Sequence, residues 1–437
     1  MSDPIRVGLL GLGTVGQGVV RVLQRNAEEI ARRAGRPIVI SRASARDPNK
    51  ARDCDLSQVA IEADPMRVVT ADDVDLVVEL IGGETPAFVL IGEAIRRGKP
   101  VVTANKALVA ERGNELFELA RGAGTMIAYE AAVAGGIPII KSIREGLAAN
   151  RVLSVVGIIN GTCNYILTQM SLRGIDFGTA LTEAQQLGYA EADPTFDVEG
   201  VDAAHKLTIL ASIAFGIPLA FERVACEGIA RIQSQDIELA KALGYRIKHL
   251  GVAKRGMDGV ELRVQPTLIA DDQLLAKVDG VLNAIVVHGD AVGRTGYYGR
   301  GAGGEATASA VIADLVDAVR SLDTPPQHRV PYLAFQPDAI APMEVLPLEK
   351  IESAYYLRVC VADEPGVLRS ITSILAELDI SVEAIIQKEP RAAEDAVVAI
   401  ITSVVQEARF NEACARIEAL PSVRSGFSRL RVEHFDS

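Results

Sequence analysis

The sequence predicts an α/β protein: a doubly wound parallel sheet, then an α+β domain, then a second, small α+β module. Three observations support this prediction. Short β-rich runs alternate with amphipathic segments over roughly the first 130 residues, a glycine triplet follows the first such run, and six of the 19 prolines lie between positions 325 and 347. Alternating strands and helices form a parallel sheet covered on both faces. The proline-rich stretch excludes a helix or a central strand and separates the last module from the rest.

The N-terminal domain is expected to contain five strands, with helices between them that end in glycine. The strands are expected at 5–10, 38–40, 74–78, 100–103 and 125–129, and the helices at 15–34, 86–97 and 108–121.

Longer helices and alternating strands from about residue 140 indicate an α+β domain. Its helices are expected at 179–187, 201–215 and 237–243, and its strands at 151–159, 260–266 and 283–289.

In the last module, strands are expected at 354–361, 397–405 and 423–432, and helices at 366–378 and 410–419. We therefore expect domains at 1–140, 141–322 and 351–437, a connector at 323–350, and a helix near 305–320 that packs back on the first domain.

The composition excludes several classes of protein. The net charge of −12 argues against nucleic acid and anionic membrane surfaces as partners. The shortage of aromatics, with nine Tyr, ten Phe and no Trp, argues against stacking platforms for bases or sugars. No apolar run approaches the ~18–20 residues of a membrane span, and Asp3 with the lack of a cleavage site argues against a signal peptide. Five cysteines without a CxxC pair predict free thiols in a reducing cytoplasm, and five histidines without an HExxH pair predict no zinc site.

A phosphate-binding turn is predicted directly after the first strand. It has the pattern GxGxxG and consists of Gly11, Leu12, Gly13, Thr14, Val15 and Gly16. The first glycine permits a tight turn, the second lets the backbone approach a pyrophosphate, and the third lets helix and strand pack closely. The start of the helix adds N–H groups and the positive end of a dipole. A strand before and a helix after the motif favour a Rossmann-type dinucleotide-binding domain over a merely structural turn.

The acidic residue that would bind a ribose 2′-hydroxyl is missing after the second strand. The segment 41–46 contains Arg42 and Arg46 instead. An arginine there suits a 2′-phosphate, so the sequence favours NADP(H), with NAD(H) as the alternative. Two solvated loop cations are the structural interpretation of the same residues.

Two lysines are candidates for the chemistry. Lys106 follows Thr103 at the expected carboxyl edge of the sheet and opens a helix, against the preference of the helix dipole. Asp202 and Lys206 lie four residues apart at the start of an apolar helix, so they share a face that we expect to be partly desolvated. The alternatives are a surface lysine and an exposed ion pair, which would contribute little.

The chain resembles homoserine dehydrogenase over nearly its whole length. The resemblance rests on TANKA at 103–107, YEAAVAGGIP at 129–138, GIINGTCNY at 157–165, GRGAGG at 299–304 and the dense segment 184–206. It implies interconversion of L-aspartate 4-semialdehyde and L-homoserine, a step in threonine, methionine and isoleucine biosynthesis. It implies a cytoplasmic enzyme that assembles as a homodimer or homotetramer.

The resemblance also implies roles for individual residues. Lys206 and Lys106 are the expected catalytic lysines, together with Asp202. The substrate is expected to contact Glu191, Asp202, Asn160, Gly161 and Thr162, and the cofactor to contact Thr103, Lys106, Gly188 and Gly303 in addition to the glycine turn and Arg42. A structural sodium ion is expected at the backbone carbonyls of Glu130, Val133, Gly135 and Ile137.

The C-terminal module resembles an ACT domain, a ligand-sensing βαββαβ fold. The resemblance rests on the turn that contains Asp363, Gly366, Val367 and Leu368. N–H groups at the helix start would bind an amino acid carboxylate. The expected effector is threonine, and a module that only assists dimerisation is the alternative.

Two other functions are compatible with parts of the sequence. One is an acylating aldehyde dehydrogenase with Cys163 as nucleophile. This would leave the lysine and carboxylate cluster without a role. The other is a non-catalytic nucleotide and amino acid sensor, against which the intact set of Lys106, Glu191, Asp202 and Lys206 argues.

Overall fold

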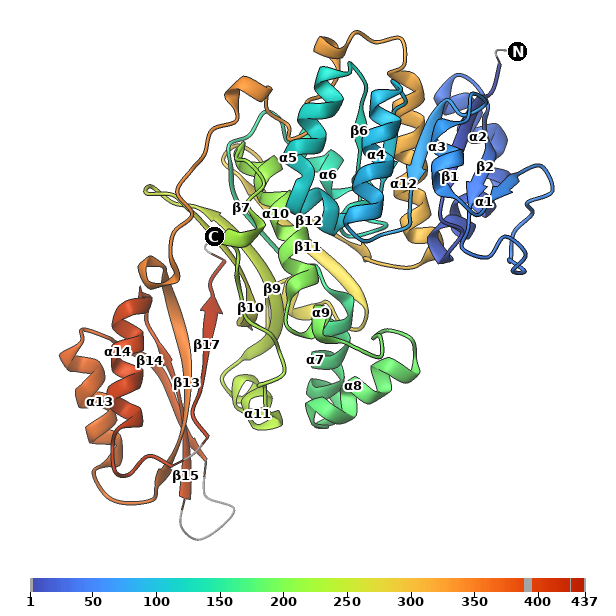
Figure 1. The fold of residues 1–437 in the computed structure, drawn as a ribbon. Helices are drawn as coiled ribbons and strands as arrows, with labels where there is room; N and C mark the ends of the chain where they lie inside the picture. The colour runs from blue at the N-terminus through green and yellow to red at the C-terminus, as the bar shows by residue number, and fades with distance from the viewer. Residues whose placement is uncertain (1–2, 389–394, 425, 436–437) are drawn as a thin grey trace. The chain divides into compact units, whose positions relative to one another are not determined.

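The computed structural model describes residues 3–388, 395–424 and 426–435. They form two compact units, and each is described by itself (Figure 1). The first unit consists of Met1–Ile159, Asp202–Val224 and Leu282–Met343. The second consists of Asn160–Val201, Ala225–Val281 and Glu344–Ser437.

A parallel sheet with helices on both faces forms the core of the first unit (Figure 1). Its strands are β1 (Ile5–Leu10), β2 (Ile38–Ser44), β3 (Ala60–Glu62), β4 (Leu76–Glu79), β5 (Val101–Thr103) and β6 (Ile127–Ala128). The helices are α1 (Thr14–Arg25), α2 (Ala27–Ala34), α3 (Pro65–Thr70), α4 (Thr85–Arg96), α5 (Lys106–Gly122) and α12 (Gly304–Arg320). The strand order β3-β2-β1-β4-β5-β6 is that of a doubly wound dinucleotide-binding sheet, which confirms the predicted fold class.

Strand β2 is longer than the sequence suggested, because its parallel pairing with β1 continues to the pair Leu10 and Ser44. The expected strand at 38–40 stopped where polar residues begin. Those residues are tolerated because Arg42 forms ion pairs at the side of the sheet. The residue that follows the end of β2, where a dinucleotide-binding fold contacts the ribose, is therefore Ala45 and not Ser41.

Helix α12 packs against α1. A Cβ atom on Gly18 would lie 2.5 Å from the carbonyl oxygen of Gly304, so the two helices approach as closely as glycine allows. The first unit also contains a short antiparallel group in the order β12-β11-β7 and the buried helix α10 (Val201–Phe215). These strands are β7 (Val152–Ile158), β11 (Leu282–Gly289) and β12 (Gly293–Arg300).

The second unit is built on one mixed sheet in the order β9-β10-β17-β13-β15-β14. Its strands are β9 (Tyr245–Arg255), β10 (Val260–Ala270), β13 (Glu352–Ala362), β14 (Val382–Lys388), β15 (Asp395–Thr402) and β17 (Ser428–Glu433). Its helices include α7 (Gly161–Arg173), α8 (Phe177–Gln186), α9 (Thr195–Val198), α11 (Ser234–Ala242), α13 (Val367–Glu377) and α14 (Glu407–Glu418).

The last module has the βαββαβ order that the ACT resemblance implies and the strand order β17-β13-β15-β14, with α13 and α14 on one face (Figure 1). Strand β14 has no counterpart among the strands expected from the sequence. The closing strand β17 pairs with β13 on one side and, in parallel, with β10 on the other. The module therefore continues the sheet of the preceding domain.

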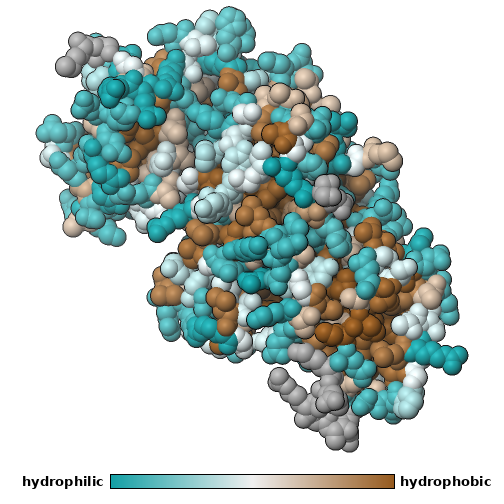
Figure 2. All heavy atoms as spheres, turned by 180° about the vertical axis from the view of Figure 1, so that it is seen from behind, coloured by the Kyte–Doolittle hydropathy of each residue, from teal (hydrophilic) through white to brown (hydrophobic). Residues whose placement is uncertain are grey.

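The surface is mostly polar, with apolar areas that include one on the C-terminal module (Figure 2). Val382 and Ile385 are exposed on β14, the last strand of the sheet. Among the described residues, no helix is both long enough and apolar enough to cross a membrane.

Candidate active site

The glycine turn lies between β1 and α1, as its motif requires. Gly11 has φ +103°, and a Cβ atom on Gly16 would lie 2.1 Å from the carbonyl oxygen of Gly11. A Cβ atom on Gly13 would meet nothing within 4 Å, so this side of the turn is open. No side chain caps the start of α1. The turn thus offers backbone N–H groups to an anion.

The start of α12 lies beside this turn. Gly303 has φ +116° and open space at its Cβ position, and a Cβ atom on Gly304 would lie 2.9 Å from the carbonyl oxygen of Thr14. Two glycine-rich segments that are far apart in the sequence therefore meet at the edge of the sheet where a dinucleotide would lie.

Arg42 lies within β2 and already has two carboxylate partners. Its Nε lies 2.6 Å from Asp73 Oδ1, and its Nη1 lies 3.0 Å from Glu62 Oε1. Arg46 lies two residues beyond the end of β2 and is exposed. In a dinucleotide-binding fold the ribose contact comes from the end of this strand. Arg46 is therefore better placed than Arg42 to meet a 2′-phosphate.

Asp202 bridges the two lysines. Its Oδ1 lies 2.9 Å from Lys106 Nζ, and its Oδ2 lies 2.6 Å from Lys206 Nζ. Lys206 also donates to the carbonyl oxygen of Ile159 over 2.8 Å. The Asp202 side chain is 5% exposed, Lys206 11% and Lys106 34%. Burial alone would raise the pKa of the Asp202 carboxyl, but Lys206 and Lys106 outweigh it and hold that pKa well below its usual range.

A buried carboxylate that the sequence analysis missed holds the edge of the sheet in place. Glu79 ends β4, and its carboxylate accepts from Thr103 Oγ1 over 2.6 Å and from the N–H groups of Ile81 and Gly82. Thr103 in turn accepts from the N–H of Asn105, which caps α5. A glutamate at the end of an otherwise apolar run was the signal that could have identified it.

A second missed pair joins the two lysine-bearing helices. His205 on α10 lies 2.9 Å, from Nε2 to Oε1, from Glu111 on α5, and its ring packs against Phe221. The His205 side chain is buried, and burial lowers its pKa. Helix α10 carries Lys206 and α5 carries Lys106, so this pair fixes the spacing of the two lysines.

The expected substrate residues of the second unit form a network of their own. Asn160 caps α7 by accepting from the N–H of Cys163, and it donates to Asp197 Oδ1 over 2.7 Å. Thr162 donates to the carbonyl oxygen of Tyr189 over 2.7 Å. These contacts hold the loop that contains Gly188, which has φ +73°, and the exposed Glu191.

The alternative based on Cys163 is not favoured. The thiol is fully buried, and its Sγ lies 3.2 Å from the carbonyl oxygen of Asp197. A nucleophilic thiol needs access to its substrate and a base that deprotonates it. Cys163 lies instead inside the core that α7 forms.

The expected cation loop is buried and has an unusual backbone. Ala134 has φ +55° and Gly135 has φ +47°, and a Cβ atom on Gly135 would lie 2.5 Å from the carbonyl oxygen of Gly301. The Glu130 carboxylate accepts from the N–H groups of Ile140 and Lys141. Two of the expected carbonyl ligands, those of Glu130 and Ile137, accept from the N–H groups of Val133 and Ile139 and keep a second lone pair. Carbonyl oxygens are ligands that suit hard cations.

The turn before α13 has the form that the ACT resemblance implies. Gly366 has φ +98°, Val367 opens the helix, and no side chain caps it. Asp363 is exposed on the preceding loop, and Leu368 is half-buried.

Comparison with known proteins gives a consistent result along the chain. Residues 11–130 match a family model described as the homoserine dehydrogenase NAD-binding domain, residues 138–316 match homoserine dehydrogenase, and residues 355–422 match the ACT domain. A homoserine dehydrogenase of Pseudomonas aeruginosa is 57% identical over 99% of this chain and 100% of its own.

Solved structures agree. A homoserine dehydrogenase from Thiobacillus denitrificans superposes with a TM-score of 0.94 at 55% identity, over 99% of this chain and 98% of that one. A hyperthermophilic archaeal homoserine dehydrogenase in complex with NADPH has a TM-score of 0.62 at 25% identity, over 74% of this chain and 99% of that one.

The dinucleotide-binding sheet and the matched NAD-binding model define the class, which is that of the nicotinamide-dependent oxidoreductases. Within it, the chain belongs to the homoserine dehydrogenase family and carries a C-terminal ACT domain.

Proposed function

We propose that this protein catalyses the NAD(P)-dependent interconversion of L-aspartate 4-semialdehyde and L-homoserine. The observation that carries the proposal is the buried Asp202 carboxylate between Lys106 and Lys206. Lys106 follows β5 and the glycine turn follows β1, and these are parallel strands of one sheet. The lysines and the cofactor turn therefore share the carboxyl edge where such sheets bind ligands.

The residues suit the reduction of an aldehyde. A bound nicotinamide would supply a hydride to the carbonyl carbon, and negative charge would then develop on the carbonyl oxygen. An ammonium group from Lys106 or Lys206 stabilises that oxygen and supplies its proton. Both Asp202 oxygens are occupied by lysines, so its main contribution is to hold the two ammonium groups in position. Glu191 then remains to accept the ammonium group of the substrate, and Asn160, Gly161 and Thr162 hold the loop beside it.

The cofactor is proposed to be NADP(H) in preference to NAD(H). The segment 41–46, which runs through the end of β2, contains no acidic residue and ends in the exposed Arg46, with Asp47 following it. These residues support the choice, as does the archaeal relative in complex with NADPH. Replacing Arg46 by Ala should raise KM for NADP⁺ by roughly tenfold, because a charge-assisted contact is lost. It should leave KM for NAD⁺ within about twofold. If Arg42 holds the phosphate instead, Arg42→Ala will show this selective effect and Arg46→Ala will not.

Four further features belong to the proposal. Sodium would bind at the carbonyls of Glu130, Val133, Gly135 and Ile137, where it would stabilise the buried loop. Threonine would bind at the turn of Asp363, Gly366, Val367 and Leu368 and act as a feedback inhibitor. The chain would work in the cytoplasm as a homodimer or homotetramer. The domain boundaries are those stated from the sequence, at 1–140, 141–322 and 351–437.

The test is an absorbance assay at about 340 nm, where the reduced nicotinamide absorbs. The purified protein is supplied with homoserine and with NADP⁺ or NAD⁺, with and without threonine. Turnover that depends on homoserine supports the proposed activity. Cofactor reduction that is absent with homoserine under all these conditions would contradict it.

A further inference from the structure

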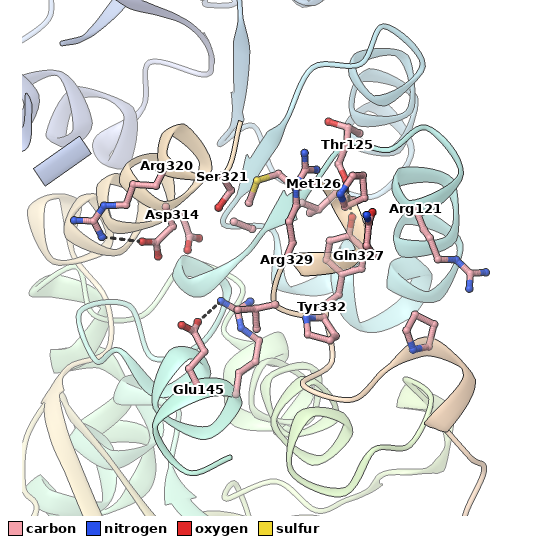
Figure 3. Close-up of a pocket in the computed structure, with 18 of the residues that line it drawn as sticks. Arg121, Thr125, Met126, Glu145, Asp314, Arg320, Ser321, Gln327, Arg329 and Tyr332 are labelled. Carbon is pink, nitrogen blue, oxygen red and sulfur yellow. Dashed lines mark hydrogen bonds and ion pairs between the residues drawn. The ribbon is translucent and has the colours of Figure 1, made fainter. Parts of the chain in front are cut away.

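A cavity of about 530 Å³ opens in the first unit, away from the edge that carries the lysines (Figure 3). Its walls come from the end of α5 and the residues that lead into β6, from Arg144 and Glu145, from the C-terminal half of α12 and from the connector at 326–337. Thr125 and Met126 lie at the amino end of a parallel strand, which is the opposite edge of the sheet from the cofactor turn. The matched family models end at residue 316 and resume at 355, so neither covers the connector wall.

The connector is anchored, so the cavity has a defined wall. Tyr332 donates to the carbonyl oxygen of Thr125 over 2.9 Å, and its ring stacks on Phe117 with centroids 5.0 Å apart. Arg329 donates to the carbonyl oxygens of Thr324 and Gly124. The proline-rich segment is thus packed against the first unit rather than extended in solvent.

Four guanidinium groups and three carboxyl groups line the cavity: those of Arg121, Arg144, Arg320 and Arg329, and those of Glu145, Asp314 and Asp317. Asp317 is paired with Lys141 and Arg320, and burial raises the pKa of Asp314 to about 8. Arg144 and Arg329 therefore face little unpaired negative charge. The Arg144 side chain is 12% exposed, and its ion pair is with its chain neighbour Glu145. Its Nε is buried without a hydrogen-bond partner in the described part of the chain. Arg329 has main-chain carbonyls as partners, and no carboxylate of a described residue lies within ion-pair distance of it. A buried donor without an acceptor is costly, and an anion would satisfy it.

The remaining walls are largely apolar. Figure 3 shows Met126, Arg329 and Tyr332 around the same space, and Ile127, Val330 and Pro331 also line it. The volume lies within the roughly 300–1,000 Å³ of small-molecule sites, in which a few polar groups fix the orientation of a mostly apolar ligand. The lining therefore selects a molecule with one anionic end and a short hydrocarbon body.

We propose that this cavity binds a small aliphatic carboxylate. The carboxylate lies on Arg144 and Arg329, and the hydrocarbon chain lies against Met126, Val330 and Tyr332. Either a simple carboxylic acid or an aliphatic amino acid presents this chemistry. The site is separate from the proposed active site and from the ACT turn, so it stands whether or not the proposed activity does.

The test is isothermal titration calorimetry on the full-length protein with three matched probes: 4-methylpentanoate, its neutral amide 4-methylpentanamide, and L-leucine. We expect the carboxylate to bind once per chain at concentrations below about 10 mM, and the amide to bind at least roughly tenfold more weakly. Binding of L-leucine tighter than that of 4-methylpentanoate would identify an amino acid as the ligand, and weaker binding would identify a simple acid.

The binding is located with variants that preserve the fold. Val330 is 47% exposed and lines the cavity, so Val330→Trp should fill it and weaken carboxylate binding at least roughly tenfold. Val89 is 48% exposed on α4 and does not line the cavity, so Val89→Trp is the matched control and should change nothing. Arg329→Gln should weaken the carboxylate and leave the amide unchanged. Equal binding of acid and amide, no binding of the acid, or full binding to Val330→Trp would overturn the proposal.

Discussion

At the scale of single residues, the structure assigns a mainly electrostatic task to Asp202. One carboxylate holds two ammonium groups at the edge of the sheet, and the low pKa of this carboxyl keeps it charged over the whole working range of pH. The sequence could predict the pair Asp202 and Lys206 from its spacing of four residues on one helix. It could not predict that Lys106 reaches the same carboxylate, because that contact depends on how α5 and α10 pack.

Lys206→Ala is expected to lower kcat by about 100- to 1,000-fold, since one of the two lysines proposed to stabilise the developing oxyanion is lost. Cofactor affinity should change little, because the glycine turn is untouched. Turnover at about 340 nm and fluorescence titration with NADPH measure the two quantities. The exposed Lys241 on α11 provides a control, and Lys241→Ala should keep full activity. An activity of Lys206→Ala close to that of the wild type would refute the assignment.

His205 makes stability depend on pH, in a direction that its burial determines. Burial lowers its folded pKa below the ordinary 6.5, so the unfolded chain takes up this proton more readily than the folded one. The wild type should therefore lose stability as the pH falls below about 6.5, by up to about 1.4 kcal/mol per pH unit from this group. His205→Gln does not titrate and can still contact Glu111, so its melting temperature should fall less between about pH 7.5 and 5.5. Parallel falls in the two proteins would contradict this account.

At the scale of elements, the length of β2 shows what local sequence reasoning lacks. The run 38–40 is apolar and predicts a strand, but the strand continues past a register shift at Ser41 because β1 pairs with it again from Arg42 to Ser44. Arg42 forms ion pairs with Asp73 and Glu62, and Arg46 lies two residues beyond the end of the strand. Pairing between strands is a tertiary effect, so a window of sequence could find the strand and still misplace its end.

A buried ion pair links the ACT domain to the domain before it. Arg358 on β13 donates from Nε to Asp236 Oδ1 over 2.6 Å, and both side chains are almost fully buried. Asp236 also belongs to the capping box of α11 and accepts from Tyr356. This contact, together with the parallel pairing of β10 and β17, makes the last module part of a continuous sheet.

Asp236→Ala should therefore destabilise the protein by about 3–5 kcal/mol, because a buried guanidinium loses its counter-charge. Differential scanning calorimetry or denaturant unfolding measures the change. The exposed Asp272 after β10 is a control, and Asp272→Ala should shift stability by less than about 0.5 kcal/mol. A small effect of Asp236→Ala would show that the pair contributes little beyond its own desolvation cost.

At the scale of the whole molecule, the sequence predicted the fold of each domain better than the contacts between residues that are distant in the chain. The GxGxxG turn, the alternating elements and the turn at Gly366 each carry a local signature, and the corresponding folds are present. Glu79, the pair of His205 and Glu111, and the cavity behind the connector carry none. Each depends on residues brought together from distant parts of the chain, and the periodicity of the sequence does not predict such contacts.

The outer strand of the ACT domain predicts how copies of the chain associate. Strand β14 is the last strand of its sheet, and Val382 and Ile385 are exposed on it at 37% and 43%. An exposed apolar edge strand favours pairing with another sheet, and in the proposed oligomer this edge would meet its counterpart. Ile385→Lys should therefore produce a smaller species in analytical ultracentrifugation, because it places a desolvated charge in the interface. Val404 is 58% exposed just beyond β15, so Val404→Lys serves as the control and should leave the mass unchanged. If Ile385→Lys sediments as the wild type does, the copies associate through another surface.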